Sequence, residues 1–138
     1  MSSEYKDWIN DLRAEFNEKM WEITELYHGW YVAFIPQMMD ELFDAIGGYI
    51  EEFEVYQIKE KFGEMRIYYG WADRDYTEQE LKDLKEIDEV VDGIINKYTD
   101  ISKNTCVKCG AKATRFSDGW VLPYCESCDF LKPAIMRC

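Results

Sequence analysis

The hydrophobic and polar positions of the chain follow helical spacing in three segments. In residues 4–28 the apolar residues recur every three or four positions, which is the period of one helix face. We expect this helix to end at "HGWY", with Gly29 as its C-cap. A second, shorter helix is expected to begin near Pro36 and to stop at Gly47-Gly48. The apolar stripe of the first helix consists of Ile9, Leu12, Phe16, Met20, Ile23 and Tyr27.

The third helical segment is "TEQELKDLKEIDEVVDGIINKY", residues 77–98. It opens with Thr77 and Glu80 at the spacing of a capping box, in which each side chain bonds to the backbone N–H of the other residue. We expect the "TDISKN" that follows to be a connector. The apolar positions of this helix are Leu81, Leu84, Ile87, Val91, Ile94 and Tyr98.

Between the second and third helices, the segment "FEVYQIKEKFGEMRIYYGW" has the composition of a β-hairpin. Its two arms are rich in β-branched and aromatic residues, and they flank "EKFGE", where Gly63 suits a tight turn. Phe53, Tyr56 and Ile58 do not alternate regularly, so the register of the first arm stays open.

The order of these elements predicts an α+β fold. Three main helices would pack with a small antiparallel β-hairpin, and a C-terminal four-cysteine module would complete the chain. We assign residues 1–100 to an acidic body of helices and hairpin, and residues 101–138 to the cysteine module. The two parts are expected to pack as one compact unit, because no low-complexity linker separates them.

Four cysteines form two CxxC pairs, Cys106 with Cys109 and Cys125 with Cys128. Two residues between cysteines allow a tight knuckle that presents both sulfurs on one side, and thiolates suit zinc. Gly110 supplies the freedom that the first knuckle needs. Asp118-Gly119 is a two-residue turn signal flanked by Phe116, Trp120 and Leu122, which we expect to return the chain to the second pair. The pattern predicts one structural zinc ion.

Other interpretations of the cysteines are less consistent with the sequence. A redox CxxC would not need a second pair, whereas iron of the rubredoxin type uses a similar spacing and stays open. A catalytic zinc ion needs an open ligand position, and four thiolates fill the shell. A deaminase would need an H-x-E motif, but the single histidine, His28, stands in "YHGW". Cys138 has no partner in the pattern and is expected to be a free thiol.

The net charge of the chain indicates which kinds of partner it favours. The chain has 28 acidic and 16 basic residues, a formal net charge of -12. Residues 106–138 hold three of the acidic and five of the basic residues, so the excess of acid lies in residues 1–105. Such a surface repels phosphate backbones and attracts basic protein surfaces. Nucleic-acid binding by the cysteine module is a weaker alternative, carried by Lys108, Lys112 and Arg115 beside Phe116 and Trp120.

Carboxylates gather on both sides of the hairpin segment. Glu51, Glu52 and Glu54 precede it or lie at its start, and Asp73 and Asp75 follow it. These residues are candidates for a partner-binding patch at one end of the sheet, or for a solvated edge that resists aggregation. No Gly-rich phosphate loop and no evident catalytic pair occurs, so we do not expect an enzyme or a small-molecule substrate. The polar N-terminus and the lack of a long apolar run favour a cytoplasmic protein without membrane contact.

The combination of "VYQIKEKFGEMRIYY", a helix and "CVKCG…DGW…YCESC" resembles small phage and prophage zinc-ribbon proteins over residues 50–128. In those relatives the hairpin turn often has two glycines, and Glu64 replaces the second one here. Within that group the chain is similar to zinc-containing anti-CRISPR proteins directed at type II-A systems. The resemblance implies a non-enzymatic inhibitor that binds the type II-A CRISPR nuclease of the bacterial host, on its recognition lobe. It would thereby block the loading of target DNA.

The resemblance carries over only the zinc ligands, onto Cys106, Cys109, Cys125 and Cys128. The acidic composition agrees with it, because the nuclease holds its guide–target heteroduplex in a positively charged channel. Two alternatives remain at this stage. One is a zinc-ribbon protein that binds nucleic acid or modulates transcription, and the other is a zinc-stapled phage adaptor.

Overall fold

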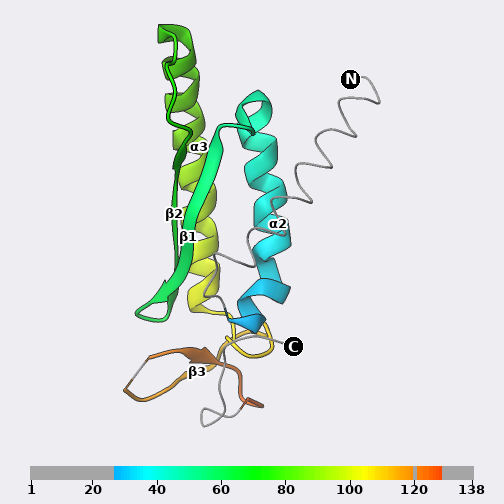
Figure 1. Ribbon diagram of the computed structural model, residues 1–138. Coiled ribbons are helices and arrows are strands. Elements are labelled where there is room, and N and C mark those ends of the chain that lie inside the picture. The colour runs from blue at the N-terminus through cyan, green and yellow to red at the C-terminus, as the bar shows by residue number, and fades with distance from the viewer. Residues whose placement is uncertain (1–26, 120, 129–138) are drawn as a thin grey trace.

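The computed structural model describes residues 27–119 and 121–128. It shows a mixed helix and sheet fold built from two helices, a long antiparallel hairpin and a small cysteine-containing module at one end (Figure 1). The first helix expected from the sequence, residues 4–28, lies almost wholly outside the described residues, so a third helix is not confirmed. The described elements are α2 (His28–Ile46), η1 (Gly47–Tyr49), β1 (Phe53–Lys61), β2 (Glu64–Trp71), α3 (Glu78–Lys103), β3 (Arg115–Phe116) and β4 (Pro123–Tyr124).

Helix α2 begins eight residues earlier than the sequence pattern suggested. Tyr27 is its N-cap and has an extended backbone, so the predicted C-cap at Gly29 is wrong. Pro36 lies inside the helix instead of at its start. Pro36 and Val32, four residues before it, are both exposed, so water can satisfy the carbonyl that proline leaves unpaired. The predicted stop is confirmed, because Gly47 caps the helix with a φ of +58°.

The hairpin explains the irregular alternation of its first arm. The register pairs Val55 with Tyr69 and Gln57 with Tyr68, so a bulge at Tyr56 inserts one extra residue. Phe53 and Ile58 are therefore both buried although they are five positions apart, and Tyr56 is exposed. At the turn, Phe62 and Gly63 both have positive φ, which is the geometry of a two-residue hairpin loop.

Helix α3 has the predicted capping box, formed by Thr77 and Glu80. Leu84, Val91 and Tyr98 of its apolar stripe are buried, but Leu81 is exposed. The helix runs on to Lys103, so the predicted connector "TDISKN" is mostly helical, and α3 crosses the boundary proposed at residue 100. Its last turn contains Ser102, which is fully buried.

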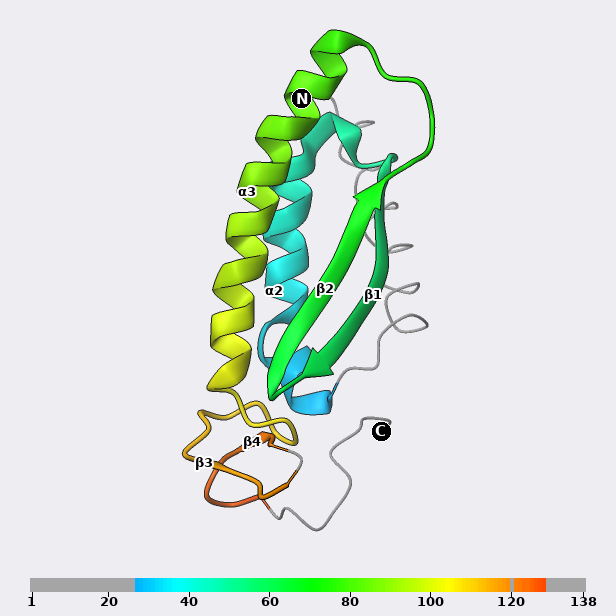
Figure 2. The same cartoon turned by 90° about the vertical axis from the view of Figure 1, so that its left-hand side faces the viewer.

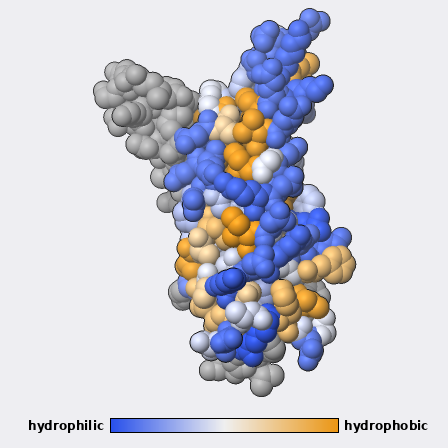
Figure 3. Space-filling view, turned by 180° about the vertical axis from the view of Figure 1, so that it is seen from behind, coloured by the Kyte–Doolittle hydropathy of each residue, from blue (hydrophilic) through white to orange (hydrophobic). Residues whose placement is uncertain are grey.

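The two helices lie side by side and antiparallel, and the hairpin lies along them (Figures 1 and 2). The hairpin turn, the start of α2 and the end of α3 point to the same end of the molecule, which we call the cysteine end. The loop between β2 and α3 lies at the opposite end (Figure 2). Seen from behind, the described surface at the α3 side of that end is largely hydrophilic (Figure 3). The core between these elements includes Trp30, Phe34, Met38, Met39, Leu42, Ile46, Phe53, Ile58, Met65, Val91 and Tyr98.

Candidate metal centre

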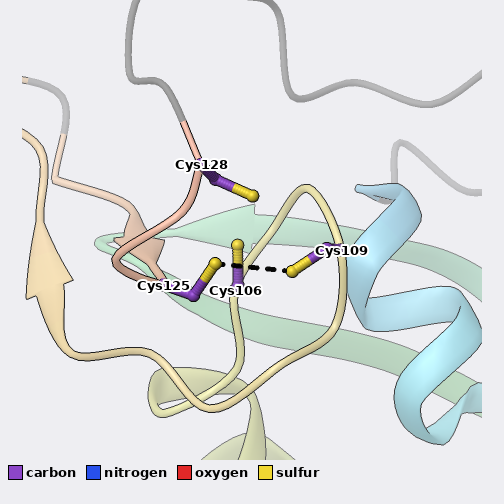
Figure 4. A group of neighbouring side chains, drawn as sticks. All are labelled: Cys106, Cys109, Cys125 and Cys128. Carbon is purple, nitrogen blue, oxygen red and sulfur yellow. Dashed lines mark hydrogen bonds between the residues drawn. The ribbon is translucent and has the colours of Figure 1, made fainter.

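The first cysteine pair lies in the loop that directly follows α3. The backbone N–H of Cys106 donates to the carbonyl of Ala111 at 2.7 Å, and the N–H of Gly110 donates to the carbonyl of Cys106 at 3.0 Å. Gly110 has a φ of +84°, which residues with a side chain rarely adopt. These contacts form the predicted knuckle, and they direct Cys106 and Cys109 toward a common point (Figure 4).

The second pair follows β4, and an arginine side chain supports it. The N–H of Cys128 donates to the carbonyl of Cys125 at 3.4 Å. Arg115, on β3, donates from Nε to the carbonyl of Cys125 at 3.0 Å, and from a second nitrogen to the carbonyl of Cys128. The loop between β3 and β4 is longer than the predicted two-residue turn, because the strands pair Phe116 with Pro123.

All four sulfur atoms lie within 4.8 Å of one another. The sulfurs of Cys109 and Cys125 are 3.5 Å apart, far beyond the length of a disulfide bond, which is about 2.0 Å. Four sulfurs bound to one tetrahedral zinc ion at about 2.3 Å lie ~3.8 Å from one another. The group therefore has the size and the donor atoms to hold a metal ion such as zinc.

The electrostatics of the group favour a bound cation. Burial opposes ionisation of Cys106, but backbone hydrogen bonds from Cys109, Cys125 and Lys108 lower the pKa of its thiol to about 6. Burial raises the pKa of Cys128, and the neighbouring sulfurs of Cys125 and Cys106 raise it further. Four sulfurs this close cannot all carry negative charge unless a positive ion balances them, and metal binding removes their protons.

The first knuckle rests directly on the start of α2. The N–H of Gly29 donates to the carbonyl of Val107 at 2.8 Å, and the indole N–H of Trp30 donates to the carbonyl of Thr105 at 3.0 Å. Cys106 and Val107 have no exposed surface. The knuckle thus satisfies one of the N–H groups that every helix leaves unpaired in its first turn, and α2 has no side-chain cap of its own.

No known protein family, curated protein or solved structure matches this chain. The centre is therefore described from its own geometry. Among the residues that the structure describes, no helix has the length and apolar character that crossing a membrane requires.

The structure gathers the five candidate acidic residues at the end opposite the cysteines. Phe53 pairs with Trp71, and the N–H of Ala72 donates to the carbonyl of Glu52 at 2.6 Å, so the segments on both sides of the hairpin meet there. Glu51, Glu54, Asp73 and Asp75 are exposed. Glu52 is partly buried, and it lies 3.5 Å from Arg74, which also binds Glu80 at 2.8 Å. Glu52 therefore belongs to an ion-pair network.

The basic and aromatic residues of the module are partly engaged in its own structure. Arg115 holds the second knuckle, and Lys108 lies 5.8 Å from the ring centre of Tyr124. Phe116 is 54% exposed. Trp120 and Cys138 lie outside the described residues. His28 is the partly buried first residue of α2.

Two residues of the centre, Gly29 and Arg115, have roles that the sequence pattern did not indicate. An apolar residue every fourth position, from Trp30 through Phe34 and Met38, indicates a helix that begins before Pro36 and close to Gly29. No local signal in the sequence marks Arg115 as a support for the knuckle, because its contact depends on how β3 lies against the second cysteine pair.

Proposed function

We propose that this protein is a non-enzymatic inhibitor of an RNA-guided type II-A DNA nuclease. One structural zinc ion would stabilise the fold of the inhibitor. The observation that carries the proposal is the group of four cysteine sulfurs, which lie within 4.8 Å of one another. Four thiolates fill the tetrahedral shell of zinc and leave no position for a substrate or an activated water molecule. In this arrangement the metal stabilises a binding surface and performs no chemistry.

The binding surface we assign is the acidic end, defined as Glu51, Glu54, Asp73 and Asp75. All four carboxylates are exposed, and they lie on segments that the hairpin brings together. A guide-loaded nuclease holds its heteroduplex in a positively charged channel, and a compact acidic surface is complementary to it. The choice of this partner, and of its recognition lobe, comes from the resemblance to phage anti-CRISPR proteins. The site of action is then the cytoplasm of the bacterial host.

The test is a gel shift with a type II-A nuclease, its guide RNA and labelled duplex target DNA. We expect the zinc-loaded protein to abolish the nuclease–DNA band near one equivalent and to leave naked duplex DNA unshifted. The double variant Glu54→Lys/Asp73→Lys should restore the band, because it reverses two charges at the acidic end. The matched control is Glu86→Lys/Glu89→Lys, which makes the same charge change on exposed positions of α3.

A persistent nuclease–DNA band with the unaltered protein would show that the partner is wrong. If instead both double variants lost inhibition equally, net charge and not the acidic end would be responsible. A shift of naked duplex DNA would favour the alternative of a nucleic-acid-binding zinc ribbon.

A further inference from the structure

The β1–β2 hairpin has a second face that the core does not use. Its inner face buries Phe53, Ile58 and Met65 against the helices. The outer face carries two exposed tyrosines, Tyr56 at 56% and Tyr68 at 45%. Exposed apolar side chains that lie next to one another on one face are typical of interaction sites.

The bulge in β1 places Tyr56 on this outer face. Its ring lies across the strand over Gly70, where an added Cβ would be 2.9 Å from two ring carbons. Tyr68 is the next outward residue of β2 and pairs with Gln57. The two rings are thus neighbours along the outer face of the hairpin.

Basic residues continue the strip toward the hairpin turn. Lys59 pairs with Arg66 across the ladder, and its ammonium lies 5.3 Å from the ring centre of Tyr68. Lys61 lies 5.6 Å from the ring centre of Phe62, which is 82% exposed at the turn. Two carboxylates lie among these cations. Glu64 binds Arg66, and it also binds Lys103 of α3 at 3.1 Å. Glu60, between Lys59 and Lys61 in β1, accepts from the N–H of Gly63 at 2.7 Å. Lys59, Lys61 and Arg66 therefore outnumber the carboxylates of the strip, and both carboxylates are already engaged.

The strip ends at a cavity of about 500 Å³ between the hairpin turn and the β3–β4 loop. It is lined by Glu60, Lys61, Phe62, Gly119 and Val121, and Val121 is 47% exposed. Gly63 makes the close approach possible, because an added Cβ would lie 2.9 Å from the carbonyl oxygen of Val121. The cavity therefore presents one aromatic ring, one aliphatic side chain and one cation, beside the carboxylate of Glu60, which accepts from the N–H of Gly63.

We propose that this strip binds single-stranded nucleic acid, independently of the acidic end. We call it the aromatic strip and define it as Tyr56, Tyr68, Lys59, Arg66, Lys61 and Phe62. The rings stack on bases and the cations contact phosphates, which is how sheet surfaces bind single strands. An acidic peptide would use the cations but not the faces of the rings. Duplex DNA hides its bases, and the acidic remainder of the chain repels its dense phosphates.

The experiment measures fluorescence anisotropy of a labelled oligothymidylate of about ten nucleotides, titrated with the zinc-loaded full chain. We expect saturable binding that weakens as salt rises, and much weaker binding to a duplex of equal length. Tyr68→Ala should weaken binding about tenfold, because it removes one stacking surface. Lys59→Glu should weaken it further and reduce the salt dependence. Lys82→Glu, an equal charge change on an exposed position of α3, is the matched control and should bind as the unaltered protein does.

Thermal melts of each variant separate loss of binding from loss of fold, since both altered side chains lie on the surface. The proposal is overturned if the oligothymidylate does not bind, if the duplex binds equally well, or if Lys82→Glu loses as much affinity as Lys59→Glu. Inhibition of the nuclease is not part of this experiment, so the two proposals fail independently.

Discussion

At the scale of single residues, Gly29 decides whether the cysteine module can rest on the body. An added Cβ would lie 2.7 Å from the nitrogen of Gly110 and 2.7 Å from the carbonyl carbon of Val107, and closer still to the carbonyl oxygen of Cys106. All three are backbone atoms, so no side-chain rotation relieves the clash. The same glycine donates its N–H to Val107, which ties the start of α2 to the first knuckle.

Replacing Gly29 by alanine should therefore destabilise the protein by about 1–3 kcal/mol or more, because the knuckle must move away from the helix. Chemical denaturation of the zinc-loaded protein measures the change. Gly93→Ala is the control, since nothing lies within 4 Å of its added Cβ in α3. It should stabilise by roughly 0.5–1 kcal/mol through helix propensity. If the two substitutions changed the free energy of unfolding equally, the close contact at Gly29 would contribute nothing to stability.

At the scale of elements, the last turn of α3 holds the start of β2. The N–H of Met65 donates to Oγ of Ser102 at 2.9 Å, and Oγ1 of Thr99 donates to the carbonyl of Met65 at 3.2 Å. Ser102 is fully buried and in turn donates to the carbonyl of Thr99 at 2.6 Å. The turn of helix that the sequence pattern assigned to a connector thus positions the hairpin against α3.

Substituting Ser102 by alanine should lower the free energy of unfolding by about 1–3 kcal/mol, because it leaves the buried N–H of Met65 without a partner. Denaturant titration gives the value. Asn96→Ala, at an exposed position of the same helix, should change stability by well under that amount. A neutral Ser102→Ala would indicate that water replaces the hydroxyl and that the contact does not fasten the strand.

At the scale of the whole molecule, the four-cysteine group lies where the start of α2, the end of α3 and the hairpin turn meet. The start of α2 bonds to the first knuckle, the cysteine loop continues from α3, and the hairpin turn approaches the β3–β4 loop at Val121. Folding of a metal module is coupled to metal binding. Because the module also caps α2, loss of the metal should destabilise the helices and the hairpin as well as the cysteine loop.

Chelation of the metal, or the substitution Cys125→Ser, should therefore lower the melting temperature of the whole protein in a single transition. Metal analysis of the unaltered protein should give one zinc ion per chain, and the variant should lose it. Circular dichroism at a helical wavelength reports on α2 and α3. If Cys125→Ser kept its metal content and its melting temperature, the four-ligand assignment would be wrong.

Local patterns were sufficient for much of this structure. The capping box of Thr77 and Glu80, the stop at Gly47 and the knuckle at Gly110 were all predicted from residue type and spacing. These features depend on contacts between residues close in sequence, so their signals are local. The grouping of the four cysteines follows the same logic, because each CxxC pair is a local turn and thiolates select a small set of metals.

The sequence by itself therefore determined the types of the described elements, the end of α2, the start of α3 and the set of possible metal ligands. Only the tertiary structure decided that α2 starts at His28, because the carbonyl of Val107, 78 residues away in the chain, satisfies its first turn. It likewise decided that Tyr56 faces outward, since the bulge shows itself only in the pairing with β2. Contacts between distant segments override local preference when they satisfy buried polar groups or exclude water, and no spacing rule within one segment contains that information.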